Sequence, residues 1–136
     1  MNREIKFRGK GIADNEWYYG DLIQVESGRV HYFIIQDYEI KEDRIELNTC
    51  ASPEVNPDTI GQYTGLHDKN GKEIYEGDIL KSVQWNNIYL VKYIGTAFYL
   101  CRKGNNGFNK ITTWNNAEKS EIIGNITDNP ELLGGE

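Results

Sequence analysis

The central part of the chain brings three carboxylates close together, at Glu73, Glu76 and Asp78. Paired carboxylates are the usual groups for general acid–base catalysis, provided that both side chains reach one substrate. In a strand, however, Glu73 faces away from the other two, and Glu76 shares a face with Asp78 only when no bulge occurs at Gly77. An aspartate beside a glycine more often accepts hydrogen bonds from nearby backbone amides. We therefore interpret these carboxylates as structural.

Metal-ligating and nucleophilic residues are few and are not grouped. The two cysteines (Cys50, Cys101) and the two histidines (His31, His67) include no pair at Cys-x-x-Cys or His-x-x-x-His spacing. The string DKNG at residues 68–71 resembles the start of a calcium loop but lacks its closing glutamate. No nucleophile elbow, Walker loop or dinucleotide fingerprint occurs. The sequence predicts a protein that is not an enzyme, holds no metal or cofactor, and keeps two free thiols in a reducing compartment.

The composition favours a soluble, β-rich protein. Of 136 residues, 38% are hydrophobic and 16 are aromatic (3 Trp, 9 Tyr, 4 Phe), which is enough apolar material to form a core. The 14 glycines and the many Ile, Tyr and Thr residues favour strands and tight turns over long helices. No stretch is long and apolar enough to span a bilayer, and the N-terminus lacks the apolar core of a signal peptide. We expect one domain over residues 1–136, in the cytoplasm.

The charge is distributed unevenly along the chain. The whole sequence has 15 basic and 21 acidic residues, a net charge of −6, and residues 1–68 hold 7 basic and 13 acidic residues, which is also −6. The acidic excess is concentrated at residues 37–46. Because affinity for a phosphate backbone comes from Lys and Arg, this charge opposes strong nucleic-acid binding. A solvated acidic face is the plainer interpretation.

Alternating and apolar runs predict a series of strands. They lie at residues 3–8, 17–25, 30–35, 59–64, 78–85, 88–94, 97–102 and 121–126. The pair Asn70-Gly71 predicts a type I′ hairpin turn, because both residues tolerate the positive φ that this turn requires. Pro130 behind Asp128 and Asn129 predicts a short C-terminal helical turn. Residues 37–58 and 104–120 receive no firm assignment.

A weak internal repeat divides the chain into halves at roughly 1–65 and 66–136. The string YGDLI at residues 19–23 recurs as EGDIL at 76–80, and IGQYT at 60–64 recurs as IGNIT at 123–127. Chance is the alternative, because Gly-Asp-aliphatic strings are common at strand starts. The repeat predicts two related small half-barrels or meander sheets, and an SH3-like barrel is one form they could take. The residues to which we assign structural roles are Gly20, Asp21, Asn70, Gly71, Gly77, Asp78 and Gly124.

Five strings together resemble the YopX family of bacteriophage and prophage proteins. They are REIKFRGK (3–10), EWYYGDLI (16–23), VNPDTIGQYTGL (55–66), YTGLHDKNGKEIYEGDIL (63–80) and EIIGNITDNPELL (121–133). The strings are in the family's order, and residues 24–54 and 82–119 carry no match. The resemblance implies a viral accessory protein that acts in the cytoplasm of the bacterial host. It brings no catalytic residues.

Aromatic side chains are the main candidates for an interaction surface. Adjacent aromatics on strands are usually core or cross-strand pairs, but the run at residues 17–19 must place a large ring on each face of its strand. We predict an interaction surface that includes Trp17, Tyr19, Tyr75 and Trp85. The predicted function is non-enzymatic and acts through protein–protein contacts, with an unidentified partner or a second copy of the chain. The alternative is a small β-barrel that binds single-stranded or duplex nucleic acid.

Overall fold

A computed structural model describes residues 4–36, 38–47, 52–83, 86–104, 107–111 and 115–134. The chain is mainly β, as its composition predicts, and it forms two compact units, Met1–Gln62 and Tyr63–Glu136. The division falls close to the boundary between the halves of the sequence repeat. A common origin of the two halves stays a prediction.

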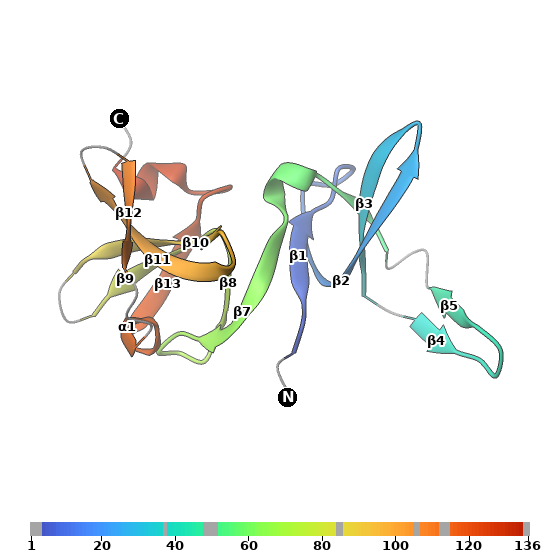
Figure 1. Cartoon of the computed structure of the whole chain (residues 1–136), viewed down its shortest axis with the longest axis horizontal. Helices are drawn as coiled ribbons and strands as arrows, with labels where there is room; N and C mark the ends of the chain where they lie inside the picture. The colour runs from blue at the N-terminus through green and yellow to red at the C-terminus, as the bar shows by residue number, and fades with distance from the viewer. Residues whose placement is uncertain are drawn as a thin grey trace. The chain divides into compact units, whose positions relative to one another are not determined.

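The first unit is an antiparallel sheet with a separate two-stranded ribbon (Figure 1). In the sheet, β6 pairs with β3, β3 with β2 and β2 with β1, and the first residues of β7 pair with the other side of β1. The ribbon consists of β4 and β5, which pair with each other. The bounds are β1 Phe7–Lys10, β2 Trp17–Ser27, β3 Arg29–Ile35, β4 Tyr38–Ile40, β5 Ile45–Leu47, β6 Glu54–Val55 and β7 Gly61–His67, with a 3-10 turn η2 at Pro57–Thr59.

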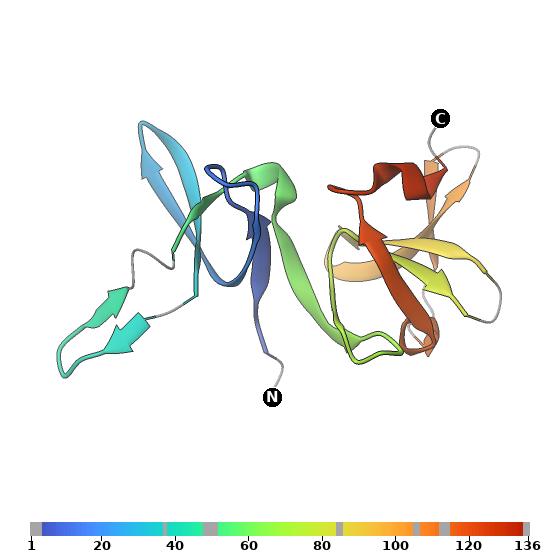
Figure 2. The same cartoon turned by 180° about the vertical axis from the view of Figure 1, so that it is seen from behind.

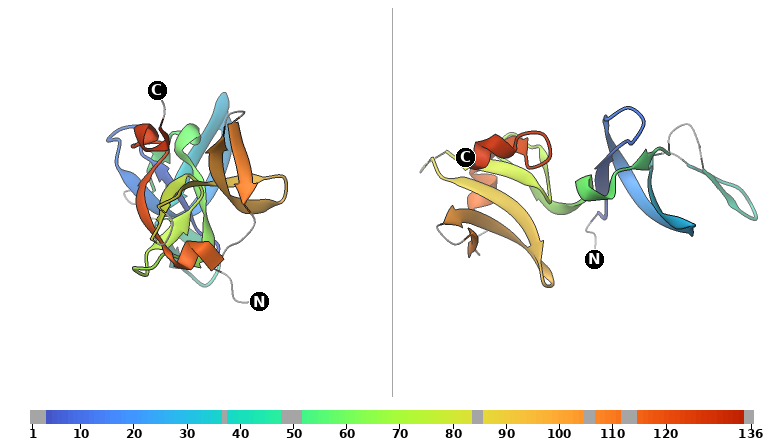
Figure 3. Two further views of the ribbon diagram at one scale, coloured as in Figure 1. Left: turned by 90° about the vertical axis from the view of Figure 1, so that its left-hand side faces the viewer. Right: turned by 90° about the horizontal axis from the view of Figure 1, so that it is seen from above.

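Two glycines in the strands of the first unit allow close packing. β1 starts at Phe7, later than the alternating pattern predicts, and continues through Gly9, which the sequence places in a loop. A Cβ at Gly9 would lie 3.0 Å from the side chain of the fully buried Val55, so the missing side chain lets β1 pack against Val55. At Gly20 a Cβ would lie 2.3 Å from the carbonyl oxygen of Ile35. Only glycine fits at that point of the long β2–β3 hairpin, which Figure 3 shows from two further directions.

The second unit holds a five-stranded antiparallel sheet of order β12-β11-β10-β9-β13 (Figure 2). Its core contains Ile74, Leu80, Tyr89, Val91, Leu100 and Ala117. The bounds are β8 Glu73–Tyr75, β9 Asp78–Ser82, β10 Ile88–Ile94, β11 Ala97–Gly104, β12 Gly107–Ile111, a short helix α1 Asn115–Glu118, β13 Ser120–Asn125 and a 3-10 turn η3 Pro130–Leu133. In the described part of the chain the two end strands of this sheet are not paired, so the sheet is open and not a closed barrel.

The C-terminal helical turn predicted from Pro130 is present as η3. Asn129 is its N-cap residue, Pro130 stands in the first turn, and Gly134 ends it with a φ of 71°. The Asn129 side chain does not cap the turn. Its Oδ1 instead accepts a hydrogen bond from the backbone N–H of Asn125, at 3.2 Å. This side chain therefore fixes the path of the chain from β13 into η3.

The prediction of a type I′ turn at Asn70-Gly71 is wrong. Gly71 has a φ of 81°, but Asn70 is not among the described residues with positive φ. The N–H of Gly71 donates to the carbonyl oxygen of Asp68 at 3.0 Å, and the N–H of Asp68 donates to that of Lys72 at 2.9 Å. The loop between β7 and β8 is therefore longer than two residues, and Gly71 is the residue in it that has a left-handed backbone.

The Asp68 carboxylate explains why the longer loop is preferred. Its Oδ1 accepts hydrogen bonds from the backbone N–H groups of Asn70 (2.8 Å) and Lys72 (2.9 Å), and its Oδ2 accepts one from the N–H of Ile122 (3.0 Å). The side chain is buried, with the residue 5% exposed. Burial alone would raise the pKa of this carboxyl, but the three amides and the nearby Lys72 lower it below its usual value. Asp68 thus connects the β7–β8 loop to β13.

Replacing Asp68 by asparagine should destabilise the second unit by about 2–4 kcal/mol, because buried amide donors lose a charged acceptor. The wild type should lose this stabilisation in acid. Because the pKa of the Asp68 carboxyl is lower in the folded than in the unfolded state, its contribution to stability is complete above about pH 4. The contribution is lost as the pH falls through the folded-state pKa. Urea unfolding at several pH values and hydrogen exchange at the Ile122 amide measure both effects.

Glu118→Gln is the matched control, because it removes one exposed carboxylate from the same unit. A variant at Asp68 that is as stable as this control, with unchanged protection of the Ile122 amide, would contradict the structural role of the carboxylate.

Candidate interaction surfaces

The predicted surface residue Trp17 lies between two cations in the first unit. In the pairing of β1 with β2, Trp17 is opposite Lys10 and Tyr19 is opposite Arg8, so all four residues belong to one face of the hairpin. The Arg8 guanidinium carbon is 4.7 Å from the centroid of the Trp17 ring, and the Lys10 ammonium is 5.6 Å from it. Both distances are typical of cation–π contacts.

Exposure differs among these four residues. Tyr19 is 44% exposed and Trp17 is half-buried, whereas Arg8 is only 6% exposed. The guanidinium of Arg8 therefore lies beneath the aromatic surface. We call Trp17, Tyr19, Arg8 and Lys10 the aromatic face. The sequence indicated its two rings but not its two cations, although the strand predicted over residues 3–8 contains Arg8.

The loop that leads into Trp17 is held by Asp14. Its carboxylate accepts hydrogen bonds from the hydroxyl of Tyr18 and, at 3.1 Å, from the backbone N–H of Glu16. The hydrogen bond from Tyr18 is the main cause that lowers the pKa of the Asp14 carboxyl, and the same bond raises the pKa of the Tyr18 phenol. This local arrangement sets the direction in which β2 begins.

Tyr75 does not belong to a surface. It is 2% exposed, its ring centroid is 5.5 Å from that of Tyr63, and its hydroxyl donates to a carboxylate oxygen of Glu73 at 3.0 Å. The register places it directly opposite Tyr63 in the β7–β8 pair, so the two rings fill the core of the second unit. The prediction of an interaction role is wrong for this residue. Trp85, the remaining aromatic candidate, lies outside the described residues.

The glycine–aspartate pairs occupy different settings in the two units. Asp78 is 2% exposed at the start of β9, and its Oδ2 accepts a hydrogen bond from the N–H of Tyr75 at 2.7 Å, which is the structural role predicted for it. Asp21 is exposed in the middle of β2, next to the tightly packed Gly20. Gly77 has a φ of 94°. At Gly124 a Cβ would lie 2.5 Å from Oδ1 of Asn129.

The groups considered for chemistry are dispersed. Asp78 is engaged by Tyr75, and Glu73 also accepts from a tyrosine. Cys101 is buried, with its Sγ 4.0 Å from the carbonyl oxygen of Tyr99, and Cys50 lies outside the described residues. Within the described ranges, no three His, Cys, Asp or Glu side chains come together as metal ligands do, and no helix is long and apolar enough to cross a membrane.

A surface that sequence reasoning missed is the ribbon of β4 and β5, which Figure 1 shows in teal. The ribbon pairs Ile40 directly with Ile45, so these two apolar side chains share one face. Ile40 is 73% exposed and Ile45 is 62% exposed. Arg44 in the connecting turn forms ion pairs with Asp43 and Glu46, at 3.0 and 2.9 Å. We call residues 38–47 the acidic ribbon.

The Tyr18 phenol should titrate above its usual pKa of about 10. Its hydroxyl donates to the Asp14 carboxylate, and removing that proton would place two negative charges side by side. The hydrogen bond between Tyr18 and Asp14 is therefore present at neutral pH and is lost as the pH rises through the raised pKa of Tyr18. NMR titration of the assigned Tyr18 ring carbons measures this pKa. Asp14→Asn should lower the pKa toward 10, and an identical titration in both proteins would contradict the contact.

Comparison with known proteins identifies relatives over nearly the whole chain. Among solved structures, the chain is similar to protein EF1440 from Enterococcus faecalis, with 26% identity, a TM-score of 0.64, and coverage of 97% of this chain and 99% of that one. No curated protein matches it. The family model described as YopX protein matches residues 6–134. The resemblance seen in the five sequence strings is thus confirmed: this chain belongs to the YopX family.

Proposed function

We propose that this protein is a non-enzymatic phage accessory protein that acts in the host cytoplasm by binding another protein. The observation that supports the proposal is the acidic ribbon, where Ile40 and Ile45 lie opposite each other and are each more than 60% exposed. Scattered single apolar side chains on a surface are ordinary, whereas two exposed isoleucines paired across a ribbon that joins no other described strand favour a contact site.

The ribbon is poorly stabilised on its own. It has three residues in each strand, and an isolated two-stranded hairpin is only marginally stable in water. Burying an isoleucine side chain fully contributes about 1.5–3 kcal/mol. A partner that covers Ile40 and Ile45 would therefore order the ribbon and gain affinity from the same contact.

The charge of the segment indicates the chemistry of the partner. Residues 37–46 contain five acidic and two basic side chains, a net charge of −3, and Arg44 is already paired with its own neighbours. The fitting partner presents an apolar cleft with lysines and arginines at its rim, because complementary charge speeds association and excludes wrong partners. A second acidic ribbon is a poor fit, since two such segments repel each other.

The double substitution of Ile40 and Ile45 by threonine tests the ribbon. Threonine keeps the β-branched shape and strand preference but removes apolar surface. Proteins captured from infected host cells by the wild type should be lost with this variant and kept with the control Val83→Thr, whose valine is 58% exposed in the second unit. The captured protein is then titrated in purified form. The dissociation constant of the complex should be at least tenfold higher for the double variant than for the wild type. For the wild type it should also rise with increasing salt concentration.

Equal affinity of the double variant and the control for the purified partner would overturn the role of the ribbon. Light scattering of the protein alone shows whether the partner is a second copy. A stable dimer that the double threonine substitution dissociates would overturn the basic-partner assignment.

The aromatic face supports nucleic-acid binding as a second candidate function. Trp17 and Tyr19 present rings beside Arg8 and Lys10, and a base stacked on an aromatic side chain contributes about 1–3 kcal/mol. The net charge of residues 1–62, with 7 basic and 12 acidic side chains, is −5 and opposes this function. We therefore place it behind protein binding.

Titration of a fluorescent single-stranded oligonucleotide at low salt discriminates the two functions. The protein-binding proposal expects little binding and no change with Trp17→Leu. A steep fall in affinity with salt, together with at least tenfold weaker binding of Trp17→Leu, would instead establish the aromatic face as a nucleic-acid site.

A further inference from the structure

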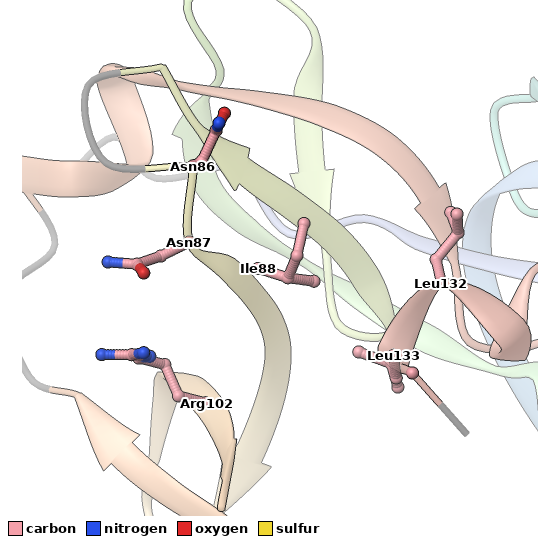
Figure 4. Close-up of a pocket in the computed structure, with 7 residues that line it drawn as sticks. Asn86, Asn87, Ile88, Arg102, Leu132 and Leu133 are labelled. Carbon is pink, nitrogen blue, oxygen red and sulfur yellow. The ribbon is translucent and has the colours of Figure 1, made fainter. Parts of the chain in front are cut away.

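A hollow of about 390 Å³ opens in the second unit beside the start of β10. It is lined by the loop before β10, by β11 and by the C-terminal turn η3 (Figure 4). This volume is in the range of sites for small ligands. The lining residues are Asn86, Asn87, Ile88, Arg102, Leu132, Leu133 and Gly134.

Asn87 and Arg102 both carry N–H donors beside the hollow, and the Asn87 amide also carries an acceptor oxygen. In Figure 4 the side chains of Asn87 and Arg102 extend in the same direction. Two hydrogen bonds hold Asn87 in place. Its side-chain Nδ2 donates to the Tyr89 hydroxyl at 3.4 Å, and its backbone carbonyl oxygen accepts from the backbone N–H of Ser82 at 2.8 Å. Arg102 is exposed and forms no ion pair with any residue that the structure describes. Its guanidinium is available to an anion.

The remaining wall is aliphatic. Ile88, Leu132 and Leu133 are half-buried, and Figure 4 shows the two leucines on the side away from Arg102. Leu132 packs closely over the backbone at Gly124, where a Cβ would lie 2.9 Å from its Cδ1. The wall is therefore supported by β13. None of the residues that line the hollow is acidic.

We propose that this hollow binds an aliphatic carboxylate, with the carboxylate on Arg102 and Asn87 and the hydrocarbon part against Ile88 and Leu133. Arginine binds a carboxylate through two parallel N–H donors. One guanidinium balances the single charge of a carboxylate, whereas the described residues of the lining include no second cation for a phosphate dianion. A free branched-chain acid and the C-terminal leucine of a peptide present this same chemistry.

Three probes test this site by NMR titration of the full chain. They are 4-methylpentanoate, acetyl-Gly-Gly-Leu with a free carboxylate, and the same peptide with a C-terminal amide. Both carboxylates should shift the signals of Asn87, Ile88 and Arg102, and the amide should bind at least tenfold more weakly. Tighter binding of the free peptide than of the small acid identifies a polypeptide C-terminus as the source, and the reverse order identifies a metabolite.

Two substitutions and one control complete the experiment. Arg102→Gln should weaken binding of both carboxylates at least tenfold, and Leu133→Thr should weaken it severalfold. Lys119→Gln removes one exposed positive charge from the same unit and should change nothing. Equal binding of acid and amide, unchanged affinity of Arg102→Gln, or shifts confined to residues outside the hollow would each overturn the proposal. These outcomes are independent of the acidic ribbon, which belongs to the first unit.

Discussion

A single buried carboxylate organises the second unit. Asp68 accepts hydrogen bonds from the backbone of Asn70, Lys72 and Ile122, so one side chain satisfies donors from a loop and from a strand far along the chain. Burying a charge is costly unless it is fully hydrogen-bonded. At Asp68 the three amides and the nearby Lys72 offset that cost, and together they lower the pKa of the carboxyl. These hydrogen bonds therefore hold the β7–β8 hairpin against β13 independently of the packing of apolar side chains.

Much of the fold could be predicted from local sequence pattern. The strands β2, β3, β10 and β11 follow their alternating or apolar runs, because each has a face that the core must bury. The turn at Asn70 and Gly71 was placed correctly but assigned the wrong geometry. The geometry of this turn depends on Asp68 and on Ile122, which lies 54 positions from Asp68 in the sequence. Rules based on neighbouring residues cannot predict a contact over that separation.

The interaction surfaces were predicted less completely than the fold. Trp17 and Tyr19 could be predicted, because three adjacent aromatic residues cannot all lie on one face of a strand. Arg8 and Lys10 could be assigned to the same face only from the register of β1 and β2. Tyr75 looks the same in sequence and is buried, because Tyr63 stands opposite it. The acidic ribbon escaped prediction for a different reason. Ile40 and Ile45 stay exposed in the first unit. Rules that assign apolar residues of a strand to a buried face therefore do not apply to them.

The self-contained pairing of β4 and β5 has an evolutionary consequence. Because these strands hydrogen-bond only to each other among the described strands, substitutions, insertions or deletions between residues 38 and 47 leave the sheet pairings of β1, β2, β3 and β6 intact. Selection can therefore diversify this segment without loss of the scaffold, as it does with loops carried on a rigid framework.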